Sequence, residues 1–201
     1  GFADLNAFFV LAPWLFLLLV PALSMRSFAE EKRTGTLELL LTKPLSLWQI
    51  LLGKYIVNLM LLLTALLPTV VYFFAIDALK LGDNPIDWGS AISAYCGLFC
   101  VGASFVALGI FSALLTKSQA TAFMLALLLC FLQFYVWKSI AELMKDQGLY
   151  RFFNAVGIFE HFLNLRQGVV TLKDIVYFLG FNYIVLYISK QLLYNIKNQE
   201  L

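Results

Sequence analysis

Five long apolar runs constrain the fold of this chain more than any other feature of its sequence. Apart from Lys190 near the end of the last run, none of them contains a charged residue. A helix of about 20 apolar residues crosses the hydrocarbon core of a bilayer, because it satisfies its own amides and rises about 1.5 Å per residue. We therefore predict spanning helices over residues 5–25, 55–76, 91–115, 120–137 and 175–193.

The composition leads to the same class of protein. Hydrophobic residues make up 62% of the chain and charged residues 13%, and the mean hydropathy is +0.86. A soluble domain carries about twice that share of charge. We predict an all-α integral membrane protein in which residues 1–201 form a single transmembrane domain, surrounded by the lipid bilayer and without a nucleic-acid partner. Pro13, Pro21 and Pro68 lie inside the runs, and we expect helix kinks there.

The positions of lysine and arginine predict the orientation of the spans. Placing the loop of residues 26–54 in the cytoplasm puts the N-terminus of the chain outside and the C-terminus inside. The basic residues on the cytoplasmic side are then Arg26, Lys32, Arg33, Lys43, Lys54, Lys117, Lys190 and Lys197. The outer segment, residues 138–174, also carries five basic residues, but long loops follow the rule weakly.

Helix start and stop signals divide the loop of residues 26–54. Gly35 is free to take a positive φ and ends a first polar helix, and Thr36 is suited to cap a short helix over residues 37–42. Pro44 stops that helix. Ser46 and Gln49 then fit a capping box at the start of the helix that enters the second span.

The short helix of this loop is amphipathic, with Leu37, Leu40 and Leu41 on one stripe and Glu38 and Thr42 exposed beside it. Two interpretations follow. The helix is either a connector resting on lipid headgroups or a docking element for a cytosolic protein. The carboxylates of Glu30, Glu31 and Glu38 favour a basic protein partner, because a helix that faces lipid is usually rich in lysine and arginine.

The same loop resembles the loop after the second span of ABC-2-type transporter permeases. In that family a string E-x-x-x-G-T-x-E-x-L-x-x-x-P-(V/L)-S forms the cytoplasmic coupling helix. The matching positions here are Glu31, Gly35, Thr36, Glu38, Leu40, Pro44, Leu45 and Ser46. The resemblance implies an ATPase-coupling interface formed by Glu30, Glu31, Arg33, Gly35, Thr36, Leu37, Glu38, Leu40, Leu41 and Pro44.

A second stretch, residues 160–178, looks like the outer re-entrant region of one branch of this family. That branch is the permease subunit associated with bacterial gliding motility, and it is close to permeases of the nitrous-oxide-reductase maturation type. It marks Glu160, His161 and Arg166 as residues of the outer re-entrant segment. These permeases have six spans in a type V exporter-like fold. Because this chain has five and begins at Gly1, we expect an earlier span upstream.

The resemblance implies a subunit of the bacterial inner membrane that dimerises with a second copy or a paralogue and binds a cytosolic ABC ATPase. Closure of the ATPase pair would push on residues 36–42. The sequence contains no G-x-x-x-x-G-K-[ST] phosphate cradle, so we expect ATP and Mg²⁺ on the partner ATPase, and neither catalysis nor a cofactor on this chain. The rival interpretations are a non-transporting mechanotransmitter or scaffold acting on an outer partner, and an intramembrane enzyme, which the lack of paired catalytic groups disfavours.

The remaining polar and sulfur residues favour structural roles. Four uncharged polar residues within the spans are interpreted as helix-packing groups: Asn58, Thr64, Gln133 and Asn182. The same interpretation covers Cys96, Cys100 and Cys130, with the small-residue pairs Ala103/Ala107 and Gly109/Ala113, and it also favours a structural role for His161. No carboxylate is fully embedded in a predicted span, which argues against a proton- or sodium-coupled carrier. In the outer segment we predict one or two short amphipathic helices dipping into the outer leaflet, with Trp137 and Tyr150 at the membrane interface. In a transporter this segment would receive an accessory extracytoplasmic membrane protein.

Overall fold

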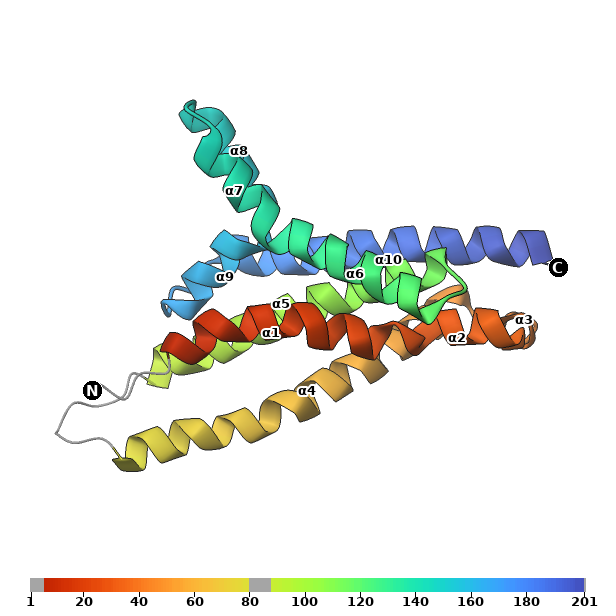
Figure 1. The fold of residues 1–201 in the computed structure, drawn as a ribbon, viewed down its shortest axis with the longest axis horizontal. Helices are drawn as coiled ribbons and strands as arrows, with labels where there is room; N and C mark the ends of the chain where they lie inside the picture. Colours follow the sequence, from red (N-terminus) through yellow and green to blue (C-terminus); the bar gives the residue numbers. More distant parts are fainter. Residues whose placement is uncertain (1–5, 80–87, 201) are drawn as a thin grey trace.

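The protein is described here by a computed structural model that covers residues 6–79 and 88–200, and every regular element in those ranges is helical (Figure 1). Five of its helical stretches are long and apolar enough to cross a membrane: Ala7–Thr34, Leu47–Val71, Trp88–Leu115, Gln119–Leu143 and Leu172–Asn198. The elements in order are α1 (Asn6–Ser24), α2 (Arg26–Thr34), α3 (Thr36–Leu41), α4 (Leu47–Leu79), α5 (Trp88–Leu115), α6 (Gln119–Phe131), the π-helix η1 (Leu132–Val136), α7 (Trp137–Leu143), α8 (Gln147–Val156), α9 (Ile158–Arg166) and α10 (Leu172–Glu200).

Each of the five predicted spans lies on one of these helical stretches, and the fold class is confirmed. Four helices, α4, α5, α6 and α10, begin before the predicted spans, and local caps explain the early starts of α4 and α10. Thus α4 begins at Leu47, just after the Ser46 cap, and α10 begins at Leu172 and runs to Glu200. Helices α1 and α4 continue through Pro13 and Pro68, and the chain leaves α1 only at Met25. The kinks at the prolines stay predictions, and Leu5, the predicted first residue of the first span, lies outside the described residues.

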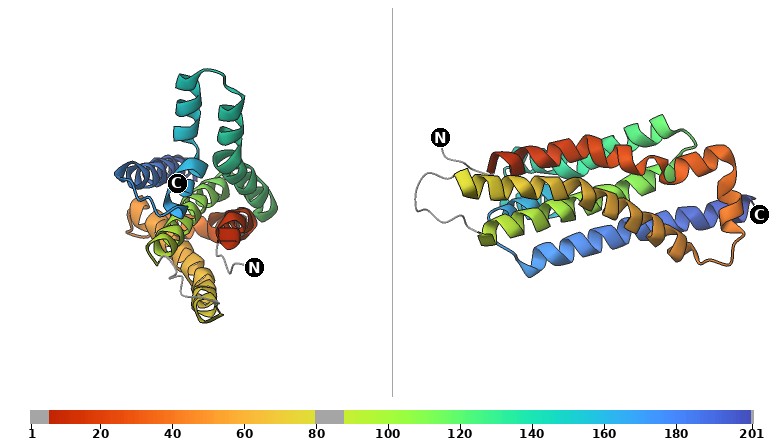
Figure 2. Two further views of the ribbon diagram at one scale, coloured as in Figure 1. Left: turned by 90° about the vertical axis from the view of Figure 1, so that its left-hand side faces the viewer. Right: turned by 90° about the horizontal axis from the view of Figure 1, so that it is seen from below.

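Helix α5 lies at the centre of the bundle, with α1, α4, α6, α9 and α10 packed around it (Figure 2). Its glycines allow neighbouring helices to approach closely. A Cβ at Gly109 would lie 1.8 Å from the Oγ of Ser24 in α1, and one at Gly102 would lie 2.5 Å from a methyl carbon of Leu62 in α4. Ala103, Ala107 and Ala113 are buried on the same helix. These contacts confirm that the small residues of this span serve helix packing.

The fourth span does not end at Trp137. It passes through η1, in which one turn is wider than an α-helical turn, and continues as α7 to Leu143. Helices α7 and α8 form a hairpin that leaves the bundle at an angle, and α9 returns to pack against α5 and α10 (Figures 1 and 2). Beyond this span the outer segment contains two short helices, α8 and α9, in agreement with the prediction of one or two, while their place in the outer leaflet stays a prediction. Lys138 and Glu142 stand four residues apart and pair across a turn of α7 without ending the helix.

Candidate partner-binding site

The turn between α2 and α3 depends on Gly35. This residue has φ +71° and ψ 5° and serves both as the C-cap of α2 and as the N-cap of α3. A Cβ at this position would meet nothing within 4 Å, so the backbone angle alone favours glycine. The predicted positive φ is confirmed. The predicted cap at Thr36 was wrong, because Gly35 takes the N-cap and the Thr36 hydroxyl pairs instead with the Thr34 hydroxyl at 2.9 Å.

Helix α3 has one buried and one exposed side. It extends over Thr36–Leu41, one residue earlier than predicted at each end. Leu37 and Leu41 are only 1% and 2% exposed and belong to the core of the bundle, whereas Leu39 is 67% exposed and Glu38 is also exposed. A six-residue helix is not stable by itself, so the two buried leucines hold it in place.

The start of α4 is fixed by local hydrogen bonds. The amide of Ser46 donates to Oε1 of Gln49 at 2.8 Å, and the amide of Gln49 donates to Oγ of Ser46 at 3.2 Å. This is the reciprocal pattern of a capping box, and it confirms the sequence prediction. The chain between Leu41 and Leu47 is therefore a short turn with a defined helix end on each side.

Glu31 faces the bundle and not the surroundings. Lys54 of α4 donates to Oε1 of Glu31 and to the carbonyl of Ser27, each at 2.5 Å, and its ammonium lies 4.8 Å from the centre of the Phe28 ring. Asn58, one turn further along α4, donates to Oγ of Ser27 at 2.8 Å. These bonds join α2 to α4, so a displacement of α2 acts on α4 directly.

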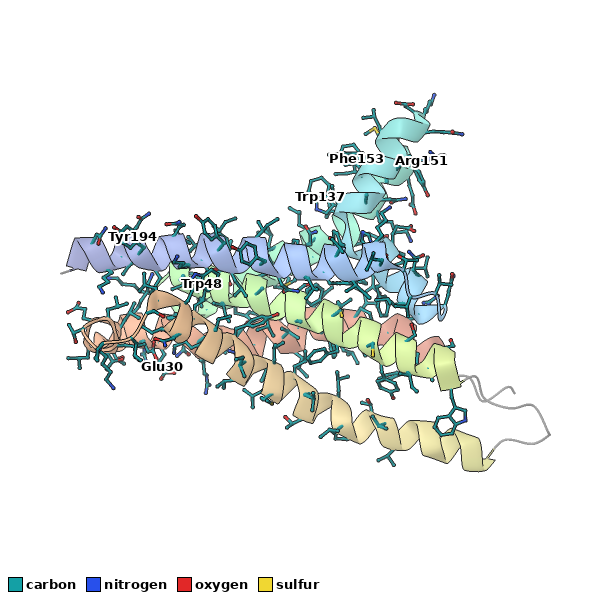
Figure 3. The ribbon with its side chains drawn as sticks, turned by 180° about the vertical axis from the view of Figure 1, so that it is seen from behind. Glu30, Trp48, Trp137, Arg151, Phe153 and Tyr194 are labelled. Carbon is teal, nitrogen blue, oxygen red and sulfur yellow. The ribbon has the colours of Figure 1, made fainter. Side chains whose placement is uncertain are left out.

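The residues predicted for the coupling interface divide into two groups. One group is exposed at the end of the bundle that carries α2 and α3: Glu30, Arg33, Gly35, Thr36, Glu38 and Pro44. The other is buried or half-buried and holds the segment in place: Glu31, Leu37, Leu40 and Leu41. Figure 3 shows Glu30 on the outside of this end. Sequence reasoning missed the exposed Leu39, although helical spacing places it on the side opposite Leu37 and Leu41.

The polar residues within the spans mostly bond between helices, as predicted. Asn182 of α10 donates to Ser104 of α5 and accepts from the Tyr55 hydroxyl of α4, both at 3.3 Å. Gln133 of η1 donates to the Val156 carbonyl at 2.7 Å and to the Tyr177 hydroxyl at 3.0 Å. Thr64 is the exception, because it is exposed and donates only to the Leu61 carbonyl of its own helix.

Trp137 packs against α8 and η1, and its predicted place at the membrane interface stays a prediction. Its ring stacks on Phe153 at 5.9 Å between centroids, and its Nε1 donates to Oε1 of Gln133 at 3.0 Å. Figure 3 shows Trp137 and Phe153 on the same side of the hairpin, with Arg151 on the opposite side. Tyr150 is exposed on α8. The aromatic stack and the Gln133 bonds thus connect α8 to η1.

His161 has the structural role that the sequence predicts. Its Nδ1 lies 2.6 Å from Oδ1 of Asp174, and its ring stacks on Tyr177 at 3.9 Å between centroids. Thr171 donates to the other carboxylate oxygen at 2.6 Å, while the Asp174 amide donates to the Thr171 hydroxyl at 3.3 Å. Glu160 and Arg166 are half-buried and stay outside this cluster.

Asp174 is fully buried in the first turn of α10, one residue before the predicted start of the last span, and this position leaves the expectation of no fully embedded carboxylate unchanged. It lies at the end of the span and not at its middle. A sequence signal for it existed, since Thr171 followed three residues later by Asp174, just before an apolar run, is a capping-box pattern. The carboxylate closes the α9–α10 turn with His161.

The described residues hold no group of three His, Cys, Asp or Glu side chains placed to bind a metal ion. Cys96 and Cys100 lie on α5, and Cys130 lies buried on α6. At the α2–α3 end, a short helix held by two buried leucines displays an apolar residue and a carboxylate outward.

Comparison with known protein families gives one match. The family described as ABC-2 family transporter protein matches residues 6–194, which is nearly the whole chain. A search of curated proteins found no match.

Proposed function

The chain belongs to the ABC-2 family of transporter proteins and is thus a multi-pass membrane permease subunit that works with an ABC ATPase, and from this we propose that the exposed side of α3 is the surface that receives the ATPase. The observation that carries the proposal is the division of α3 into buried Leu37 and Leu41 and exposed Glu38 and Leu39. A partner that pushes on the exposed side moves the buried leucines, and through them the bundle.

The bonds around α2 support a mechanical role for this segment. A force on α3 passes to α2 through the Gly35 turn, and from α2 to α4 through the Glu31–Lys54 pair. Helix α3 also contacts α10. Two spans are therefore attached directly to the segment. ATP and Mg²⁺ belong to the partner ATPase in this proposal, which the absence of a phosphate cradle in the sequence supports.

The proposed orientation places the α2–α3 end in the cytoplasm of a bacterium. The C-terminus of α10 lies at this same end, and the start of α1 lies at the opposite end (Figure 1). This arrangement supports an outward N-terminus for the chain. It also places α9 and the α7–α8 hairpin toward the outer side, where a second permease copy, a paralogue or an accessory membrane protein would contact them.

A second candidate function is transmission of force to an outer partner without transport. The projecting α7–α8 hairpin favours it, because α8 has no buried residue and offers a surface beyond the bundle. The resemblance of residues 160–178 to the gliding-motility branch agrees with the transmission of force to an outer partner. Deleting the gene in a gliding bacterium tests this assignment, and unaltered gliding of the deletion strain would exclude it.

Co-purification with cytosolic ABC ATPases tests the proposed surface. We expect Glu38→Lys and Leu39→Asp each to lower the recovered ATPase by at least about ten-fold, because a charge reversal or a polar group at the centre of an interface costs more than 1.4 kcal/mol. Glu142→Lys, a charge reversal on exposed α7 at the other end of the molecule, is the matched control and should leave recovery unchanged. Full ATPase recovery by both α3 variants would refute the proposal.

A further inference from the structure

A basic hollow lies where the end of α2 meets the beginning of α6. It is lined by Arg33, Lys117, Ser118, Gln119 and Ala120 and has a volume of about 470 Å³. Arg33 is in the last turn of α2, and Lys117 is in the turn between α5 and α6. The packing of α2 against α5 and α6 brings these two distant cations to the same place.

The positive charge of the hollow is not balanced within the protein. Neither Arg33 nor Lys117 forms an ion pair with any described residue, and both are exposed. Neighbouring lysines are occupied: Lys32 donates to the Leu114 carbonyl, and Lys54 pairs with Glu31. No side chain caps the first turn of α6, so its amide hydrogens add positive potential on the same side. The hollow therefore favours an anion.

An apolar stripe on α6 begins at the hollow and indicates what kind of anion fits. Ala120, Met124 and Leu128 follow each other at four-residue spacing, which places them on one face of the helix. Met124 is 66% exposed and Leu128 is 57% exposed. The stripe covers about 12 Å along the helix axis, at 1.5 Å per residue. A free phosphate would use only the hollow, whereas a ligand with an anionic head and an apolar tail would use both surfaces.

We propose that the basic hollow binds the phosphate of an anionic phospholipid, with an acyl chain lying along the α6 stripe. Basic pockets between spanning helices bind anionic lipid headgroups by the same combination of charge and apolar contact. The site goes beyond the proposed ATPase surface and assigns Arg33, which the sequence resemblance places in the coupling interface, to lipid. A lipid seated there contacts the last turn of α2 and the start of α6, and stabilises the position of α2 against α5 and α6.

Native mass spectrometry of the purified protein in detergent measures this binding. The protein is titrated with phosphatidylglycerol, and with phosphatidylcholine as the lipid of zero net charge. We expect phosphatidylglycerol to bind more tightly than phosphatidylcholine. The double variant Arg33→Gln/Lys117→Gln should bind phosphatidylglycerol about 25-fold more weakly, at about 5-fold for each lost charge. Lys145→Gln/Arg151→Gln removes the same charge from exposed hairpin positions and should bind like the native protein.

Two further arms separate the sources of the phosphate. Leu128→Asn, at an exposed stripe position, should weaken phosphatidylglycerol binding, and inorganic phosphate should fail to displace the lipid at equal concentration. Displacement at equal concentration would show a site for a free anion, and equal lipid binding by the two double variants would show no site at the hollow. Either result overturns the proposal.

Co-purification of the Arg33→Gln/Lys117→Gln variant with the ATPase distinguishes this proposal from the previous one. We expect undiminished ATPase recovery. Loss of the ATPase with unchanged lipid binding would return Arg33 to the coupling surface and overturn the lipid site, while leaving the α3 surface in place. Conversely, failure of the Glu38→Lys test would not alter the lipid titration.

Discussion

The α2–α3 segment and the α7–α8 hairpin are both amphipathic, both adjoin a span, and both lie at an end of the bundle, yet they are held in different ways. Helix α3 buries two leucines in the core, and α2 is joined to α4 by an ion pair. Helix α8 buries none of its residues, and an aromatic stack and bonds to the Val156 carbonyl connect it to the rest. The first segment is built to pass a displacement inward, and the second to present a surface outward.

The largest expected effect comes from the core contact of α3. Leu37→Ala removes a buried side chain and leaves a cavity, so we expect it to lower the free energy of unfolding by about 3 kcal/mol. Phe152→Ala on α8 removes a larger but exposed side chain and should change this free energy by less than about 0.5 kcal/mol. Unfolding of the purified protein in detergent measures both, and similar losses would erase the distinction between the two regions.

The ion pair of α2 gives the next effect. Lys54→Met leaves the Glu31 carboxylate, whose Oε2 is already buried without a partner, with no cation. We expect a loss of about 2 kcal/mol in the free energy of unfolding, and partial recovery in Glu31→Gln/Lys54→Met. A double variant no more stable than Lys54→Met would show that the pair has little part in joining α2 to α4.

The glycine of the α2–α3 turn should matter less. Gly35→Ala forces a Cβ into a left-handed backbone conformation, and we expect a cost of about 1 kcal/mol. Gly148→Ala is the matched control, since Gly148 lies in the first turn of α8 with only ordinary contact distances around it, and alanine is the better helix former. If the two substitutions had the same effect on the unfolding free energy, the positive φ of Gly35 would not limit the segment.

The smallest effect is expected at the ion pair of the hairpin. Nζ of Lys138 lies 3.7 Å from Oε1 of Glu142, and the Glu142 side chain is 61% exposed. Water and salt screen such a pair, so Glu142→Gln should lower the free energy of unfolding by less than about 0.5 kcal/mol. A loss as large as that of Lys54→Met would mean that the hairpin is fixed as firmly as α2.

The features that could be predicted from the sequence are those whose causes are local. The five spans follow from apolar length, the capping box from Ser46 and Gln49 three residues apart, and the turn from Gly35. Thr36 shows the limit even at short range, because the left-handed backbone of Gly35, which ends α2, also forms the N-cap of α3 and takes the place predicted for Thr36.

The sequence by itself determined that this chain is a membrane bundle with a bent polar segment between its first two spans. The insertion of a long apolar helix into lipid and the hydrogen bonds within one helical turn need no distant partner in the chain. Only the tertiary structure decided that Glu31 faces Lys54, that His161 meets Asp174, and that Arg33 and Lys117 share one hollow. These juxtapositions depend on which helix faces pack together, and that choice is made by contacts between residues far apart in the chain.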